Sequence, residues 1–183
     1  MLTRPRNTTH LVIGLLMLVV MSSAAAAQEP KSAALAKDLT QALDAAKLTA
    51  IAAKDPSDPD SFVAAMYFSG SQLLVVAAKY IPAVLLNEKL GKKDYQEIYI
   101  DLNSASVAST RTFIEDLGAD GLTPNHEDGK GFDSVERAGK RTSFDEHWRK
   151  EQKLSDEQYA KLFADADALY ARLLQALIAQ AKR

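Results

Sequence analysis

The chain has 183 residues, with 22 lysines and arginines against 24 aspartates and glutamates, and it contains no cysteine. A formal net charge of −2 gives no sign of the basic surface that nucleic-acid binding requires. Without cysteine, we expect neither disulfide bonds nor thiolate metal sites nor a thiol-linked lipid anchor. We therefore expect that the hydrophobic core alone stabilises the fold.

The first residues have the pattern of a secretory signal peptide. Arg4 and Arg6 precede an apolar run over 11–21, and the small residues Ala25-Ala26-Ala27 follow it. The run is too short to cross a membrane, which takes about 20 residues. We predict cleavage after Ala27, a periplasmic or secreted location, no membrane span after cleavage, and a single domain over 28–183.

The mature chain is predicted to begin with a helix and a strand. Leu35, Leu39 and Leu43 recur at helical spacing, which indicates an amphipathic helix within 32–47. The segment 48–53 is rich in β-branched and small residues and predicts a short strand. Two prolines and three aspartates over 55–60 then predict a turn.

Segments 61–68 and 72–80 are predicted to form a β-hairpin around Ser69-Gly70. In the second arm Leu74, Val76 and Ala78 point one way, whereas Leu73, Val75 and Ala77 point the other way. Both sides of this strand are therefore apolar and need a cover. The candidates for covers are a barrel interior, a helix and a second subunit.

Pro82 and Gly91 are placed as residues that begin and end a short helix over 83–90. Alternating apolar residues predict a strand within 95–104, and 110–117 is its expected partner, closed by a turn at 118–121. Residues 123–148 show no periodicity and carry three glycines, a proline and many charges, so they are interpreted as a long loop.

A long helix is predicted over 155–181. Ser155 and Gln158 have the spacing of a capping box, and Leu154 with Tyr159 has that of a hydrophobic staple. The apolar stripe continues almost to the end of the helix and is expected to reach past the core of one domain. This length predicts a homodimer that pairs through the helix.

Lys79 and Tyr80 form the candidate binding site, because they lie where the hairpin strand passes into the short helix. The ammonium of Lys79 and the free N–H groups of a helix start could together hold an anion such as a phosphate. However, no glycine-rich loop accompanies the lysine. The alternative, a structural corner with a solvated lysine, is favoured.

Metal binding and catalysis find little support in the sequence. The region 123–148 holds His126, His147 and several acids, but no calcium-loop or zinc spacing connects them, and a hydrated charged loop is favoured. Glu115 and Asp116 are adjacent in a strand and are expected on opposite faces, so they do not form an acid–base pair. Phe144 and Trp148 are interpreted as apolar anchors for the loop.

The order of elements over 33–122 resembles the split-barrel fold of the pyridoxamine-phosphate-oxidase-like flavoproteins. The resemblance rests on the segments FVAAMYF, QLLVVAAKY, AVLLNEKL, EIYIDLN and TRTFIEDL. It implies an α+β fold with an antiparallel split-barrel-like sheet, an N-terminal helix, a short inserted helix and a long C-terminal helix. It also implies a homodimer with FMN at the subunit interface and Lys79 near the phosphate. The arm FVAAMYF departs from that family because it has no basic residue.

Two functions follow from these observations. The first is an exported domain that binds a small ligand or a protein partner, without evident catalytic machinery and without a cofactor. The alternative is an FMN-dependent oxidoreductase of the split-barrel type. The fold alone does not decide between these two functions, since one fold can carry many functions.

Overall fold

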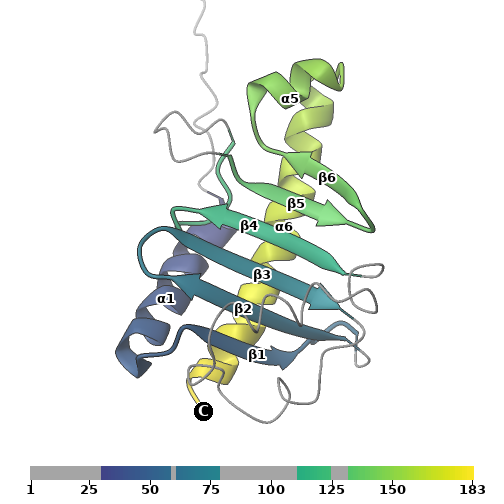
Figure 1. Ribbon diagram of the computed structural model, residues 1–183. Helices are drawn as coiled ribbons and strands as arrows, with labels where there is room; N and C mark the ends of the chain where they lie inside the picture. Colours follow the sequence, from purple (N-terminus) through teal and green to yellow (C-terminus); the bar gives the residue numbers. More distant parts are fainter. Residues whose placement is uncertain (1–29, 59–60, 79–110, 125–131) are drawn as a thin grey trace, which may run out of the picture.

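The computed structural model describes residues 30–58, 61–78, 111–124 and 132–183, which form an α+β fold. The described strands form one antiparallel sheet with the order β1-β2-β3-β4-β5-β6 (Figure 1). The strands are β1 (Ala50–Lys54), β2 (Phe62–Phe68), β3 (Gln72–Ala78), β4 (Thr112–Leu117), β5 (Ser134–Arg137) and β6 (Lys140–Ser143). The described helices are α1 (Lys31–Ala46), α5 (Glu146–Glu151) and α6 (Asp156–Ala181). The expected α+β class, with an antiparallel sheet, an N-terminal helix and a long C-terminal helix, is confirmed.

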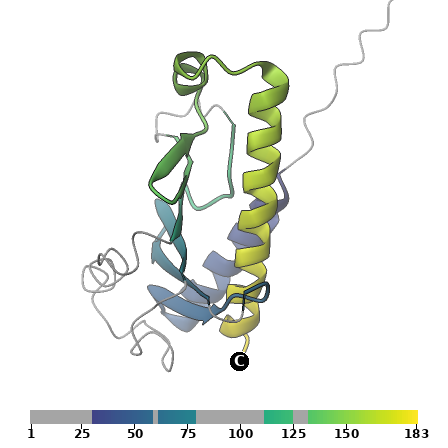
Figure 2. The same ribbon diagram turned by 90° about the vertical axis from the view of Figure 1, so that its right-hand side faces the viewer.

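Helices α1 and α6 pack against each other on one face of the sheet, which we call the inner face (Figures 1 and 2). Leu39 and Leu43 of α1 and Tyr170 and Leu174 of α6 are fully buried there. The strand residues that join them in one core are Ile51, Val63, Ala65, Tyr67, Leu73, Val75, Ile114 and Val135. The inner face is therefore a sheet-on-helix core made from nearly every described element.

The opposite, outer face of the sheet carries a second group of apolar residues, the outer apolar cluster. Its members are Ala50, Ala64, Met66, Leu74, Val76 and Ala78, with the partly buried Ala52, Phe62, Phe68 and Phe113 against them. They come from the alternate positions of β1 to β4, as period-two strands require. Neither α1 nor α6 lies on this face (Figure 2). The prediction that β3 is buried on both sides is confirmed, since Leu73 and Leu74 are 0% and 6% exposed.

The predicted start of α6 is confirmed in detail. Ser155 accepts a hydrogen bond from the Gln158 N–H, and the Gln158 side chain accepts one from the Ser155 N–H. The apolar stripe of α6 is buried within this chain, and Leu162 and Phe132 are the large apolar side chains that remain exposed among the described residues. The stripe that suggested a homodimer thus has an intramolecular partner, and the homodimer stays a prediction.

A polar contact fixes the turn after β1 against α6. Arg172 of α6 donates a hydrogen bond to the carboxylate of Asp55, which also accepts hydrogen bonds from the backbone and hydroxyl of Ser57. Burial acts to raise the pKa of Asp55, but the hydrogen bonds from Ser57 and Arg172 outweigh it and leave this pKa below its ordinary value. The carboxylate is thus held ionised beneath the turn.

The interpretation of 123–148 as a long loop is wrong for its second half, which contains β5, β6 and the start of α5. These strands have four residues each, and Val135 of β5 is the one apolar residue that they contain. The sequence of the two strands therefore shows almost no hydrophobic alternation. A two-residue turn at Ala138-Gly139, both with positive φ, joins them. Phe144 is fully buried and Trp148 packs against the core, which confirms their anchoring role.

Several predictions fall outside the described residues. These are the signal peptide over 1–27, the candidate site at Lys79 and Tyr80, the short helix over 83–90 and the strand within 95–104. The predictions for the segments around them are confirmed by α1, β1, β2, β3 and β4. The resemblance to split-barrel flavoproteins therefore stays a prediction.

Candidate functional site

The outer face of the sheet changes from apolar to charged at β4. Phe113 of β4 lies opposite Val76 of β3 on one side and opposite Glu136 of β5 on the other. Along this row of paired residues, the outer face passes from apolar to charged. Beyond Phe113 the outward positions carry Arg111, Glu115, Glu136 and Arg141, which we call the charged strip. A surface with an apolar region beside a few convergent polar groups is the usual composition of a ligand site.

Arg111 lies at the point where the charged strip meets the outer apolar cluster. Its Nη2 contacts Oε1 of Glu136 at 3.5 Å, and its Cζ lies 5.4 Å from the centre of the Phe113 ring. Its side chain is only 13% exposed. Within the described part of the chain, its buried Nε and Nη1 have no hydrogen-bond partner. A buried donor without a partner costs about 1–3 kcal/mol, and more when it is charged, so Arg111 is the best candidate for a binding residue.

The remaining groups of the charged strip are paired with one another. Arg141 donates to the carboxylate of Glu115, which also accepts a hydrogen bond from the Ser134 hydroxyl at 2.9 Å. The Arg141 side chain is 56% exposed. This pair spans β4, β5 and β6, and its geometry supports the short hairpin rather than a ligand.

A second cluster lies on the inner face, where two carboxylates are completely buried. Asp116 accepts hydrogen bonds from the Tyr170 hydroxyl at 2.8 Å and from the backbone N–H groups of Gly121 and Asp120. Asp133 accepts hydrogen bonds from the N–H groups of Leu117 and Thr123, each at 2.7 Å. The two acids thus tie the segment after β4 to β5 and to α6.

The charge of Asp116 is disfavoured by its surroundings. Burial, and after it the charge of Asp133, raise the pKa of Asp116 to about 7, although the bonds from Tyr170 and Gly121 act against this rise. Burial and the carboxylate of Asp116 in turn hold the pKa of Tyr170 well above its ordinary value. A carboxyl group with such a pKa changes its protonation near neutral pH.

Asp167 of α6 caps the start of α1 from another element. Its two carboxylate oxygens accept hydrogen bonds from the N–H groups of Lys31 and Ser32, at 2.8 and 2.9 Å. Pro30, the residue that precedes α1, supplies no side-chain cap. The hydroxyl of Ser32 also accepts a hydrogen bond from the Leu122 N–H, so the start of α1 meets both α6 and the segment after β4.

Replacing Asp167 by alanine should lower the free energy of unfolding by about 2 kcal/mol. Two N–H groups at a helix start would lose their acceptors, and a negative charge would leave the positive end of the helix dipole. Urea denaturation followed by circular dichroism measures the change. Asp165→Ala is the matched control on α6, because Asp165 is an exposed partner of Lys161, and we expect a change within about 0.5 kcal/mol. Equal losses in both variants would contradict the capping role.

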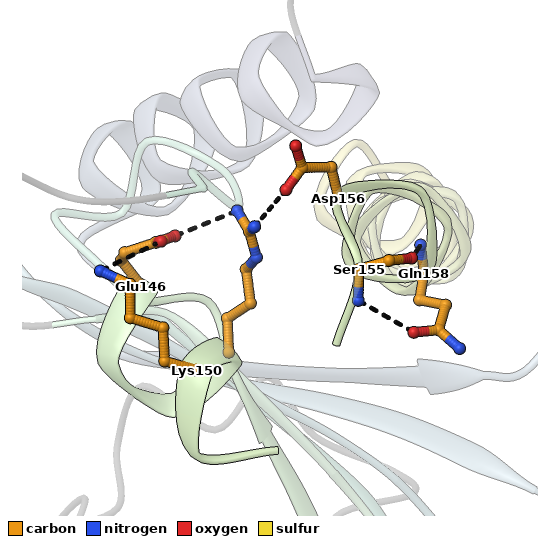
Figure 3. A network of polar contacts seen from close by, with 6 residues as sticks. Glu146, Lys150, Ser155, Asp156 and Gln158 are labelled. Carbon is orange, nitrogen blue, oxygen red and sulfur yellow. Dashed lines mark hydrogen bonds and ion pairs between the residues drawn. The ribbon is translucent and has the colours of Figure 1, made fainter. Parts of the chain in front are cut away.

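Arg149 holds α5 against the start of α6. Its guanidinium contacts Glu146 Oε2 at 3.2 Å and also contacts Asp156. Figure 3 labels both acids, Glu146 on α5 and Asp156 at the start of α6. The Cζ of Arg149 lies 5.7 Å from the ring centre of Tyr159. Although its Nε has no hydrogen-bond partner among the described residues, both terminal nitrogens are paired with acids. This cluster is structural.

The residues singled out by sequence reasoning are not brought together into one described site. His147 is 84% exposed and pairs with Glu151, whereas His126, Lys79 and Tyr80 lie outside the described residues. The described residues contain no group of three or more His, Asp or Glu side chains that could hold a metal. Glu115 and Asp116 do point to opposite faces, as predicted.

Sequence reasoning did not single out Arg111 or Asp167, and it considered Asp133 only among the acids of a possible metal site in 123–148. The signal that could have found Arg111 is its spacing of two from Phe113, which places both side chains on one face of a strand. For Asp133 and Asp167 the partners are backbone N–H groups of other elements, and no local pattern indicates them.

No described helix is long and apolar enough to cross a membrane. Comparison of the chain with protein-family models, with curated proteins and with solved structures finds no match.

Proposed function

We propose that this chain is an exported binding domain, and that it binds a small molecule at the boundary between the outer apolar cluster and the charged strip. The observation that carries the proposal is Arg111, a mostly buried cation at that boundary with donors left unpaired by the described residues. A buried polar group without a partner in a native fold calls for an explanation, and a ligand acceptor supplies one.

A small ligand is favoured over a protein partner by the burial of the apolar residues. Met66, Val76 and Ala78 of the outer apolar cluster are at most 2% exposed, so they contribute almost no area to a protein interface. A stable protein interface needs about 800 Å² of accessible surface on each partner. Among the described residues the exposed large apolar side chains are Phe132 and Leu162. Small-molecule sites, in contrast, enclose most of the ligand surface.

Binding is favoured over catalysis because the carboxylates of the sheet are engaged in ion pairs and backbone hydrogen bonds. Glu115 and Glu136 are engaged by Arg141 and Arg111, while Asp116 accepts backbone hydrogen bonds in the interior. A general acid or base has to reach the proton that it transfers. These carboxylates instead hold strands together, which suits a rigid binding frame.

The test is to purify the protein from its own cell envelope and to identify co-purifying small molecules by native mass spectrometry. We expect one ligand at unit stoichiometry, and an N-terminus at Gln28 that reports export. Turnover of an offered flavin or tetrapyrrole by the same preparation would replace binding by catalysis. A ligand-free protein whose melting temperature no small molecule changes would refute the proposal.

An FMN-dependent oxidoreductase is the second candidate, and one observation favours it. Ala77 pairs with Thr112, so Arg111 lies beside Ala78, the residue that precedes Lys79 in the chain. A phosphate held by Arg111 as well as Lys79 would be better neutralised than one held by Lys79 alone. If added FMN keeps its full fluorescence in the presence of the protein, this candidate fails.

A further inference from the structure

We propose that Arg111 recognises the carboxylate of a small monoanionic molecule whose remaining part is apolar or aromatic. This inference rests on the proposed function and names the chemical class of its ligand. Three of the five N–H donors of a guanidinium belong to Nε and Nη1, the atoms that lack a partner among the described residues. A carboxylate offers two acceptor oxygens in the plane that such donors need.

The charged groups around Arg111 favour a ligand with one negative charge over a ligand with two. Glu136 lies 3.5 Å from Arg111, while Arg141 is engaged by Glu115, so the charged strip is neutral as it stands. A bound carboxylate adds one negative charge to this neutral strip, whereas a phosphate dianion adds two. The second charge of a dianion would meet repulsion from Glu136 without a further cation from the strip to balance it.

The apolar part of the ligand follows from the other neighbours of Arg111. The Phe113 ring lies beside its guanidinium, and Val76 lies opposite Phe113 on β3. Ala78 ends β3 next to Arg111. Val76 and Ala78 are at most 2% exposed, so the half-buried Phe113 ring is the hydrocarbon surface that an aromatic or aliphatic body would cover beside Arg111.

The binding test uses benzoate and octanoate with the purified protein, followed by isothermal titration calorimetry. Benzamide is the neutral isostere of benzoate, and inorganic phosphate is the dianion probe. We expect at least one carboxylate to bind, and benzamide and phosphate to bind at least about tenfold more weakly, as expected when a charge-assisted hydrogen bond is lost. No binding of either carboxylate at millimolar concentrations, or tighter binding of phosphate, would overturn the proposal.

Variants then assign the binding to Arg111. Arg111→Met keeps the length of the side chain and removes the charge, and we expect carboxylate affinity to fall at least about tenfold. Arg137→Met removes an exposed guanidinium of β5 that lies outside the charged strip, and it should leave the affinity unchanged. Arg111→Lys keeps the charge and serves if Arg111→Met does not fold, with partial affinity expected because an ammonium lacks the planar fork. An equal effect of Arg137→Met and Arg111→Met would refute the assignment.

Stability in the absence of ligand separates binding from a structural role. If Arg111 serves a ligand, Arg111→Met removes the unpaired donors together with the weak contact to Glu136, so the ligand-free variant should melt within a few degrees of the wild type while carboxylate affinity falls. A lower melting temperature together with unchanged carboxylate affinity would show that Arg111 is structural. A neutral or phosphate ligand that binds the protein would leave the proposed binding function in place and remove only the carboxylate class.

Discussion

Replacement of Gly121 by alanine is expected to lower the free energy of unfolding by about 3–5 kcal/mol, a large part of the stability of a domain. A Cβ atom on Gly121 would lie 2.5 Å from Cα and 2.6 Å from N of Ala33, in the first turn of α1. Both are backbone atoms, so a side-chain rotation cannot relieve the overlap. The residue also has φ +94°, which strains any L side chain. Urea denaturation monitored by circular dichroism measures the loss.

Gly139→Ala is the matched control for this prediction. Gly139 also has a positive φ, +75°, but its added Cβ would meet nothing within 4 Å. Only the left-handed backbone then contributes, at about 1 kcal/mol. If both variants lose the same stability, the close approach of the segment after β4 to α1 is not a determinant of the fold. If only Gly121→Ala is strongly destabilised, the close packing of the segment after β4 against α1 depends on this glycine.

The elements that sequence reasoning predicted share a strong local signal. In α1 and α6 the apolar residues recur over several turns, and in β2 and β3 they alternate on both faces around a glycine turn. The capping box at Ser155 is also local, because its two residues are three apart. Local periodicity and local hydrogen bonds can be read from one sequence, and these elements were found with small shifts at their ends.

The β5–β6 hairpin was missed because its stability comes from pairing across the sheet. Its strands have four residues each, the lower limit for a recognisable strand pattern. Their cross-strand contacts to β4 involve Arg111 with Glu136 and Glu115 with Arg141. Ala138 occupies a turn position that asparagine or aspartate usually takes. A charged segment with glycines therefore had the composition of a loop while tertiary contacts made it a strand pair.

Of the candidate site, the sequence predicts only which face of the sheet each strand residue points to. Adjacent strand residues point to opposite faces, so the separation of Glu115 from Asp116 followed from the sequence. The partner of Asp116 on α6, Tyr170, is 54 residues away, and the neighbours of Arg111 come from three strands. Such contacts depend on the register and on helix packing, which no single segment determines.

Protonation of Asp116 is expected to stabilise the fold as the pH falls from about 7 toward 4. The pKa of Asp116 is about 7 in the folded protein against an ordinary value of 3.8, so the folded state binds a proton that the unfolded state does not bind in this range. Stability from this group is present below the ordinary pKa and is lost as the pH rises through 7. With about 1.4 kcal/mol for each pKa unit, the full effect is up to about 4 kcal/mol. Below pH 4 the ionised Asp55, whose pKa is lowered, works in the opposite direction.

Asp116→Asn separates this effect from the other acids. The amide does not titrate, so the difference in unfolding free energy between wild type and variant should grow in favour of the wild type as the pH falls from 8 to 4. A difference that stays constant with pH would contradict the prediction. The groups that face Asp116 are Asp133 before β5, Asp120 in the following turn, and Tyr170 on α6. The Tyr170 hydroxyl lowers the pKa of Asp116, so Tyr170→Phe should move the transition to higher pH, and a carboxyl ¹³C NMR titration of Asp116 in both proteins measures that shift directly.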